Sequence, residues 1–370
     1  MWLRACVLAG IFVGVLNLLA TESVMAAAPE CGAPSDIHDG WTLATPQEQG
    51  IDPALLCAMS RGVSDRKLAD VDSIVVIRHG RLVYERYFTL PGPTPTFDPA
   101  TMRHAGHSMT KSVVSLLVGI ALDRGWIVDL DAPVFSYFPE YATSRSPEKD
   151  RISLRNLLTM SDGLNSSMFF QPGEHRADPE PYRYILGTRL VREPGASFEY
   201  NSATTELIGG VLQKVSGKTV DVLAKELIFA PLGITDVEWG TRLGNGFATA
   251  SSGLSLRPRD WAKLGQLVLD HGVWEGKQIV PASWIAQSTA PHIKAQKQYS
   301  YGFQWWVGQS TVAGRVIAWS AALGYNSQKV IVIPELDLVV VFNASRESVH
   351  MIAPELDLLD QHILPAVLNR

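Results

Sequence analysis

Segments with the pattern of β-strands occur near both ends of this chain, and a long stretch with mostly helical signals separates them. Ser73–Arg78 and Arg81–Tyr87 are rich in valine, isoleucine and tyrosine, and the His79-Gly80 pair between them predicts a β-hairpin. Strand patterns return at about Tyr301. Because antiparallel strands from distant parts of a chain can pair, this order predicts one sheet built from both ends, with the helical stretch inserted between its strands.

The stretch from about Ser108 to Ser288 is expected to be mostly helical. Its residues 113–122 are apolar on nearly every face, which is typical of a helix that is buried on all sides. Asp52-Pro53 predicts the start of a short helix that ends at about Met59. The other expected helices cover residues 154–160, 204–215, 220–227, 259–270, 281–288 and 353–368, and the expected C-terminal strands cover residues 301–307, 315–319, 328–333 and 338–342.

These elements predict the α/β (α+β) class, with an antiparallel sheet of about five strands, flanking terminal helices and an inserted all-helical lobe. The segment 91–95 has the sequence Pro-Gly-Pro-Thr-Pro, which can form neither strand nor helix and marks the expected boundary. We place the sheet lobe at about residues 45–100 and 297–370 and the helical lobe at about residues 101–296. Residues 29–370 show no internal repeat and no low-complexity linker, so one folding unit with two lobes is expected.

The first residues have the layout of a signal peptide, which we place at residues 1–28. Arg4 gives a positive start, residues 6–20 are apolar, and Met25 to Ala28 supply small residues for cleavage. The alternative is a membrane anchor, but the apolar run is about 15 residues long, which is short of the roughly 20 that span a bilayer. We therefore expect a periplasmic or secreted protein, with no membrane partner after cleavage.

Two cysteines remain after that cleavage, Cys31 and Cys57, and they either form a disulfide or stay as free thiols. Neither has a histidine or second cysteine at metal-ligand spacing, so no metal and no cofactor is expected. The net charge is -5 and no basic run occurs, which makes nucleic acid an improbable partner. The expected partner is a small molecule, and nothing in the sequence indicates the oligomeric state.

Ser108 and Lys111 are three residues apart, so on a helix their side chains lie on one face within reach of each other. Lysine can then take the hydroxyl proton while serine attacks an acyl carbon. The same spacing occurs at Ser64 and Lys67 and at Ser146 and Lys149, but both of those pairs lie in charged segments. Only the first pair leads into the wholly apolar helix at residues 113–122. A helix cap and a surface lysine are the alternative roles of this pair.

Several further motifs share their order with a known group of enzymes. With the Ser108-x-x-Lys111 motif, the chain resembles the serine β-lactamase and penicillin-binding superfamily. It is most similar to the class C-related branch that contains 6-aminohexanoate-dimer hydrolases and family VIII esterases. This resemblance implies the β-lactamase/transpeptidase-like fold. The matching segments are residues 107–112, 157–164, 194–202, 231–234 and 252–254.

The resemblance implies a role for each matching residue. Ser108 would be the nucleophile, Lys111 its base partner and Tyr200 the tyrosine that relays protons to the leaving group. Either Lys111 or Tyr200 could be the general base, and the sequence does not choose between them. The backbone N–H groups of Ser108 and Tyr325 would bind the oxyanion. His107 precedes the nucleophile, but a site of this kind does not require a histidine.

The resemblance is incomplete at two motifs. Ser202 stands where the Tyr-x-Asn motif has asparagine, and it can bind a substrate amide with one donor instead of two. Ala322-Leu323-Gly324 replaces the motif whose cation holds the carboxylate of β-lactams. We expect Ser202 and Gly324 to contact substrate, and the adjacent Trp305 and Trp306 to lie on opposite faces of a strand. Either one of these rings lines the acyl pocket, or one packs in the core and the other lies at the surface.

These features predict a serine hydrolase that acts on carboxylic esters or linear amides. The first alternative is a class C-type β-lactamase or a D-Ala-D-Ala peptidase, and the second is a non-catalytic binding protein of the same fold. An α/β-hydrolase would need a Gly-x-Ser-x-Gly pentapeptide after a strand, and the sequence contains none.

Overall fold

The structure is a computed structural model that describes residues 31–88, 101–165, 177–344 and 355–368. The predicted signal peptide at residues 1–28 and the predicted boundary segment at residues 91–95 lie outside the described residues. Within the described part, no helix has the length and apolar character needed to cross a bilayer.

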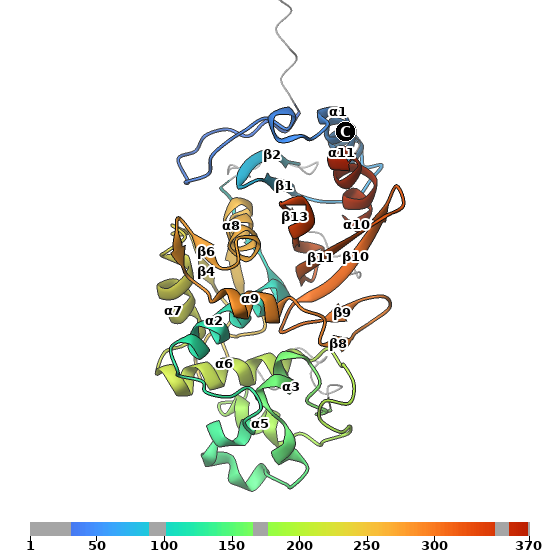
Figure 1. Cartoon of the computed structure of the whole chain (residues 1–370). Helices are drawn as coiled ribbons and strands as arrows, with labels where there is room; N and C mark the ends of the chain where they lie inside the picture. The colour runs from blue at the N-terminus through green and yellow to red at the C-terminus, as the bar shows by residue number, and fades with distance from the viewer. Residues whose placement is uncertain (1–30, 89–100, 166–176, 345–354, 369–370) are drawn as a thin grey trace, which may run out of the picture.

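The centre of the molecule is an eight-stranded antiparallel sheet (Figure 1). Its strands are β1 (Ser73–Arg78), β2 (Arg81–Tyr87), β8 (Ile293–Lys294), β9 (Ser300–Tyr301), β10 (Trp306–Val312), β11 (Arg315–Gly324), β12 (Gln328–Ile333) and β13 (Leu338–Asn343). They lie in the order β2-β1-β13-β12-β11-β10-β9-β8. Ser73 of β1 is paired with Asn343 of β13, so strands from both ends of the chain are neighbours, as the sequence predicts.

The sheet is wider than the sequence predicts, with eight strands instead of about five. The extra strands β8 and β9 contain two residues each, which is too short for an alternating pattern to be recognised. The strand expected at residues 301–307 is interrupted. The Gly302 N–H donates to the Trp305 carbonyl over 2.8 Å, and Gln304 between them has a positive φ of 62°, so the chain turns before β10 begins.

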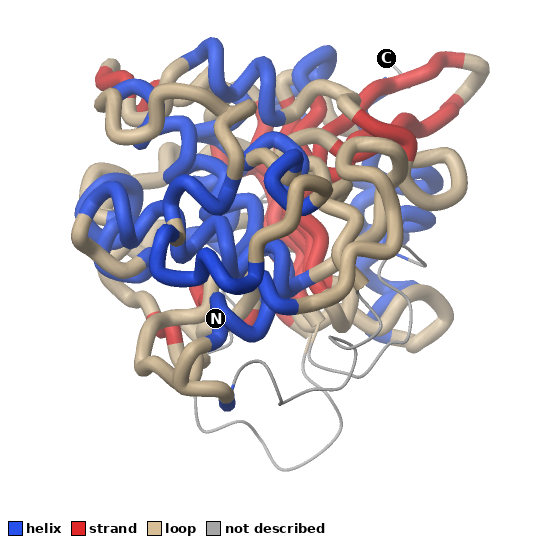
Figure 2. The backbone as a smooth tube through the Cα atoms, turned by 90° about the horizontal axis from the view of Figure 1, so that it is seen from below, coloured by secondary structure: helices blue, strands red, loops and turns tan. Residues whose placement is uncertain are grey.

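The two faces of the sheet bury different sets of side chains. On β1, Val75 and Ile77 point into the core on the side of the helical lobe, whereas Ile74 and Val76 point into the core beneath the terminal helices. β12 and β13 show the same alternation. Because successive side chains of a strand point to opposite faces, strands with both faces covered become apolar throughout. Figure 2 shows the strands running through the middle, with helices on both sides.

The terminal helices cover one face of the sheet. They are α1 (Pro53–Ser64) and the C-terminal run of α10 (Glu355–Leu358), η9 (Leu359–Ile363) and α11 (Leu364–Leu368), and α1 contacts both η9 and α11. Asp52 caps α1 by accepting a hydrogen bond of 2.8 Å from the Ala54 N–H. The helix is one turn longer than expected. A disulfide joins Cys31 to Cys57 of α1 and ties the N-terminal segment to this layer.

The other face is covered by α8 (Pro258–Leu269), which contacts β1, β12 and β13. A side chain at Gly265 would collide with Val330 and Val339, so this glycine lets α8 lie close to the sheet. The remaining helices form the helical lobe below it (Figure 1). In the described part of the chain they include α2 (Thr110–Asp123), α3 (Leu154–Leu158), α5 (Pro181–Gly187), α6 (Ser202–Ser216), α7 (Val220–Ala224) with η7 (Lys225–Phe229), and α9 (Ala282–Ser288). The 3-10 helices η3 (Val134–Tyr137), η4 (Pro139–Ser144) and η5 (Lys149–Arg151) lie between α2 and α3.

Short strands complete the fold beside α8. β3 (His104–Ala105), β5 (Leu254–Leu256) and β4 (Glu238–Trp239) form a three-stranded sheet in which β5 is central, and β6 (Val273–Trp274) pairs with β7 (Lys277–Gln278). β3 leads directly into the segment that carries Ser108, and the Gly106 N–H donates to the Leu254 carbonyl over 2.8 Å.

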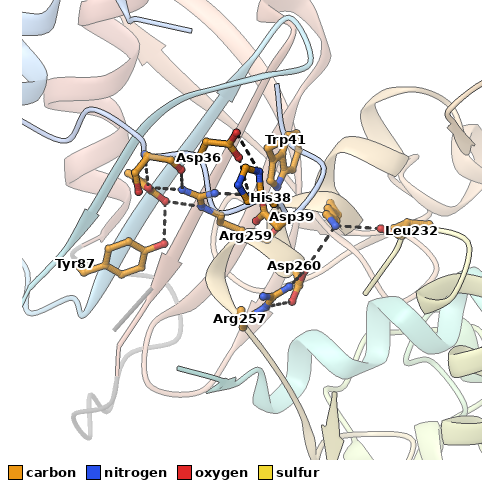
Figure 3. A network of polar contacts seen from close by, with 12 residues as sticks. Asp36, His38, Asp39, Trp41, Tyr87, Leu232, Arg257, Arg259 and Asp260 are labelled. Atoms are coloured by element: carbon orange, nitrogen blue, oxygen red, sulfur yellow. Dashed lines mark hydrogen bonds and ion pairs between the residues drawn. The ribbon is translucent and has the colours of Figure 1, made fainter. Parts of the chain in front are cut away.

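A buried cluster of charged groups joins α8 to the N-terminal part of the chain (Figure 3). The Arg259 guanidinium donates to Glu85 of β2 over 2.7 Å, to Asp39 over 3.2 Å and to the Ser35 carbonyl over 2.7 Å. The Arg259, Glu85 and Asp39 side chains are all at least nine-tenths buried. Because a buried charge that loses its partner destabilises a protein by about 3–5 kcal/mol, this cluster fixes α8 against β2.

Candidate active site

Ser108 lies in a single 3-10 turn, η2 (His107–Met109), that leads into α2. The Thr110 hydroxyl holds this turn by donating to the His107 carbonyl over 2.7 Å. His107 has a positive φ of 46°, a conformation that costs energy for a residue with a side chain. The sequence predicts a helix that begins at Ser108. The structure instead places the serine in a constrained turn before the regular helix.

Lys111 lies in the first turn of α2, and its side chain is 2% exposed. Its amine reaches three oxygen atoms: the Ser108 Oγ at 3.0 Å, the Ser202 Oγ at 3.2 Å and the Ser251 carbonyl at 2.8 Å. The carbonyl can only accept a hydrogen bond, whereas the contact with Ser108 can run in either direction. The same 3.0 Å contact therefore offers a path for the hydroxyl proton to reach the amine.

The two other Ser-x-x-Lys sequences have different environments. Lys67 is exposed and pairs with Asp65 over 2.9 Å. The Lys149 amine donates to the carbonyls of Ser144 and Leu186 over 3.3 and 2.8 Å. Among the described residues, only the lysine amine of the first motif has a hydrogen bond to the serine three residues before it, Ser108.

Tyr200 lies two residues before α6 and next to Lys111, whose amine is 5.1 Å from the centroid of the tyrosine ring. The ring is half-buried, and its hydroxyl oxygen is shielded from solvent. Burial raises the pKa of Tyr200 to about 12, and the nearby Ser108 hydroxyl opposes this increase. Tyr200 is therefore a neutral phenol at neutral pH, with its hydroxyl beside the nucleophile.

The two tryptophans lie on opposite faces of the sheet, as predicted. Trp306 stacks on the Tyr200 ring at a centroid distance of 6.0 Å and an interplanar angle of 24°, and Phe198 packs against the edge of Trp306. Trp305 belongs to the core on the side of the helical lobe, and its indole N–H is buried without a partner among the described residues. Trp306 supports the Tyr200 ring through this stacking. Both indoles are buried, and contact of either ring with substrate remains a prediction.

The end of β11 meets the segment that carries Ser108. A side chain at Gly324 would lie 2.2 Å from the Gly106 carbonyl, and a side chain at Gly106 would collide with the Trp261 ring. Only glycine permits this approach, which brings Tyr325 beside His107, the residue before the nucleophile. The Tyr325 ring is 42% exposed and meets the His107 ring edge-on at 5.8 Å. Burial lowers the pKa of His107, so this histidine is neutral at neutral pH.

Ser202 begins α6 and accepts a hydrogen bond from Lys111, as already described. Asn201 caps the helix instead, by accepting from the Ala203 N–H over 3.0 Å. In the Ala322-Leu323-Gly324 segment, where the resemblance implies a cation, Ala322 is buried in the core on the side of the helical lobe. No group of three or more His, Cys, Asp or Glu side chains that could hold a metal ion occurs in the described part of the chain.

Two residues that the sequence interpretation did not select complete the surroundings of Lys111. The Ser251 carbonyl accepts from the amine, and Glu206 accepts from the N–H groups of Ala250 and Ser251 over 2.7 and 3.1 Å. Glu206 is 1% exposed. Its signal in the sequence is a charged residue among the apolar and small residues in the first part of α6, four positions after Ser202.

This fold and this Ser–Lys–Tyr arrangement define a serine hydrolase of the β-lactamase type. The chain belongs to the Beta-lactamase family, because the sequence model of that family matches residues 64–363. It is 26% identical over 295 residues to the 6-aminohexanoate-dimer hydrolase of Paenarthrobacter ureafaciens, and this alignment covers 73% of this chain and 71% of that protein. It is 26% identical over 213 residues to the esterase EstB of Burkholderia gladioli, and this alignment covers 52% of this chain and 53% of that esterase.

Solved structures confirm the predicted fold. A family VIII carboxylesterase aligns with a TM-score of 0.67 at 16% identity, covering 88% of this chain and 98% of that one. EstCE1, described as a hydrolase with promiscuous acyltransferase activity, aligns with a TM-score of 0.64 at 17% identity, covering 85% and 98%. At such identities the likeness shows the fold alone. The family and the relatives named as hydrolases confirm that the chain is an enzyme with a small-molecule substrate.

Proposed function

We propose that this protein hydrolyses carboxylic esters, and linear amides more slowly, through an acyl-enzyme formed on Ser108. The observation that carries the proposal is the 3.0 Å contact between the Lys111 amine and the Ser108 hydroxyl in a site where the lysine is 2% exposed. A buried amine beside a serine is poised to take the hydroxyl proton, which converts a weak nucleophile into a strong one.

The reaction begins when the Ser108 oxygen attacks the acyl carbon and its proton moves to Lys111. The carbonyl oxygen becomes an oxyanion, and the backbone N–H groups of Ser108 and Tyr325 bind it. The bond to the leaving group then breaks, and the leaving group takes a proton that Tyr200 relays from Lys111. Water attacks the resulting serine ester in a second step, which releases the acid and restores Ser108.

Lys111 is the base that best suits these surroundings. Tyr200 would have to lose its proton to act as the base, but burial raises its pKa to about 12. The Lys111 amine lies over the face of the tyrosine ring, 5.1 Å from the centroid. A charge in that position stabilises the tyrosinate less than a charge at its oxygen would. Tyr200 as a neutral proton relay fits this arrangement better.

Three features favour uncharged acyl substrates over β-lactams. Ala322 replaces the cation that would hold a carboxylate, and Ser202 offers one donor where the motif has an amide. The exposed Tyr325 ring gives the mouth of the site an aromatic character. The relatives named as a 6-aminohexanoate-dimer hydrolase and an esterase support the same choice.

A panel of three substrates tests this choice. The purified mature protein should hydrolyse p-nitrophenyl butyrate with the highest kcat/KM, because an alkoxide-type leaving group departs more readily than an amine. A 6-aminohexanoate dimer should follow, and nitrocefin should be poorest, because no cation holds its carboxylate. A kcat/KM for nitrocefin tenfold above the other two would establish the β-lactamase alternative in place of the esterase.

We also propose that the chain is exported and that residues 1–28 are removed. The apolar residues 6–20, the small residues before Pro29 and the disulfide between Cys31 and Cys57 support this proposal, because disulfides persist in oxidising compartments. Mass spectrometry of the protein from the periplasm or medium should find a chain that begins at Pro29. A full-length chain that stays in the cytoplasm would contradict it.

A further inference from the structure

Lys111 is bound to a short backbone segment that a buried carboxylate holds in place. The Ser251 carbonyl accepts from the Lys111 amine over 2.8 Å. One oxygen of Glu206 accepts from the Ala250 N–H over 2.7 Å, and the other accepts from the Ser251 N–H over 3.1 Å. Both carboxylate oxygens are therefore used, and they bind the two N–H groups immediately before the carbonyl that contacts Lys111.

The position of Glu206 follows from the geometry of α6. Ser202 and Glu206 are four residues apart, so they lie on the same face of the helix, and Ser202 also accepts from Lys111. Gly209 lies one turn further, and a side chain there would come within 2.7 Å of the Ala250 side chain. The small residue lets α6 approach the 250–251 segment closely enough for Glu206 to bind it.

The charges around Glu206 come from several elements. Burial raises the pKa of the Glu206 carboxyl, and the hydrogen bonds from Ala250 and Ser251 and the positive charge of Lys111, which faces it from α2, oppose this increase. Tyr182 faces it from α5, and Tyr200 lies beside Lys111 at the start of α6. Burial raises the pKa of both tyrosines, and the charge of Glu206 adds to the increase at Tyr182. Both tyrosines are therefore neutral at the working pH, and the positive charge that faces Glu206 is the one that Lys111 acquires when it takes the Ser108 proton.

We propose that Glu206 is a positioning residue of the active site and the counter-ion of Lys111. It fixes the 250–251 segment that orients the amine, and its negative charge stabilises the ammonium that forms when Lys111 takes the proton from Ser108. This inference rests on the proposed acyl-enzyme mechanism. The Ser–Lys pair then works together with a buried carboxylate, that of Glu206, which acts through the peptide groups of Ala250 and Ser251.

The decisive variant is Glu206→Gln, which keeps the shape of the side chain and removes its charge. Without the negative charge of the carboxylate, the Lys111 ammonium is less stable, so the free amine persists to lower pH. The acidic limb of the pH profile of kcat/KM for p-nitrophenyl butyrate should therefore shift to lower pH by about one unit. The amine is then a weaker base, so the plateau should fall about tenfold. The loss should lie mainly in kcat, because the ester does not contact Glu206.

A matched control separates this effect from a loss of stability. Asp162 is another buried carboxylate that binds α6, since it accepts from the Thr204 hydroxyl over 2.6 Å and from the Leu164 N–H over 2.9 Å. It has no contact with the 250–251 segment. Asp162→Asn should lower the melting temperature and leave the acidic limb at its wild-type pH.

The outcomes are distinct. A folded Glu206→Gln protein with wild-type rates at every pH overturns the proposal, and so does a loss that is equal at every pH, because that result indicates structural damage alone. If Glu206→Gln does not fold, Glu206→Asp replaces it. Its more distant charge should move the limb in the same direction by a smaller amount, and an unmoved limb would count against the proposal. Activity that survives Ser108→Ala would instead overturn the acyl-enzyme mechanism itself.

Discussion

Replacement of Ser108 with alanine should abolish the esterase activity of a protein that remains folded. The variant lacks the oxygen that forms the acyl-enzyme, so kcat/KM for p-nitrophenyl butyrate should fall by about 10⁴-fold or more, which is the order found when a nucleophile of this kind is removed. The wild-type protein should also gain the mass of one phosphonyl group when it is treated with a fluorophosphonate, and Ser108→Ala should not.

Ser64→Ala is the matched control for this experiment. Ser64 begins another Ser-x-x-Lys sequence, but it lies at the exposed end of α1, and Lys67 pairs there with Asp65. This variant should keep the activity and the labelling of the wild type. Labelling of Ser108→Ala at the wild-type rate would mean that another residue is the nucleophile.

Replacement of Lys111 with methionine should slow acylation by about 10²- to 10⁴-fold, the range that a general base contributes. Methionine fills much of the same volume without an amine, so Ser108 loses its proton acceptor while the core stays packed. Stopped-flow measurement of the p-nitrophenol burst reports acylation separately from hydrolysis of the acyl-enzyme. The burst rate is expected to fall in this variant.

Lys263→Met is the control for the lysine variant. Lys263 of α8 is another lysine with a 2% exposed side chain. Its amine donates to the Leu232 carbonyl over 3.1 Å (Figure 3). Its loss should reduce stability and leave the burst rate unchanged. A wild-type burst rate in folded Lys111→Met would show that the amine is not the base, and Tyr200 would then be the next candidate.

The relation between sequence and structure differs from one part of the site to another. The contact between Ser108 and Lys111 is predictable because it depends on the spacing within one helical turn. The place of Tyr200 beside them follows from the resemblance, since no local pattern connects residues so far apart. Neither the local spacing nor the resemblance predicts the roles of Glu206 and Ser251. The contact between them and the contact of Ser251 with Lys111 arise only when α2, α6 and the 250–251 segment pack together.

The fold shows the same division. Long apolar strands such as β1 and β13 are evident from their composition, and their pairing follows from the order of the elements. The short strands β8 and β9 depend on neighbours that complete them, so their two residues carry no pattern of their own. The helical lobe predicted at about residues 101–296 includes α8, but in the structure α8 packs on the sheet. Its amphipathic sequence indicates a buried face, and it does not indicate which layer that face meets.

The pairing of β1 with β13 sets the order in which the molecule can assemble during synthesis. Ser73 of β1 bonds to Asn343 of β13 through their side chains, across a sequence separation of 270 residues. Until the ribosome has made the last strand, β1 and β2 are a hairpin with one open, apolar edge, which invites aggregation. The open edge of this hairpin must therefore be kept from pairing with other chains until almost the whole chain has been synthesised. The export that we propose would meet this requirement, because an exported chain passes through the translocation channel before it folds.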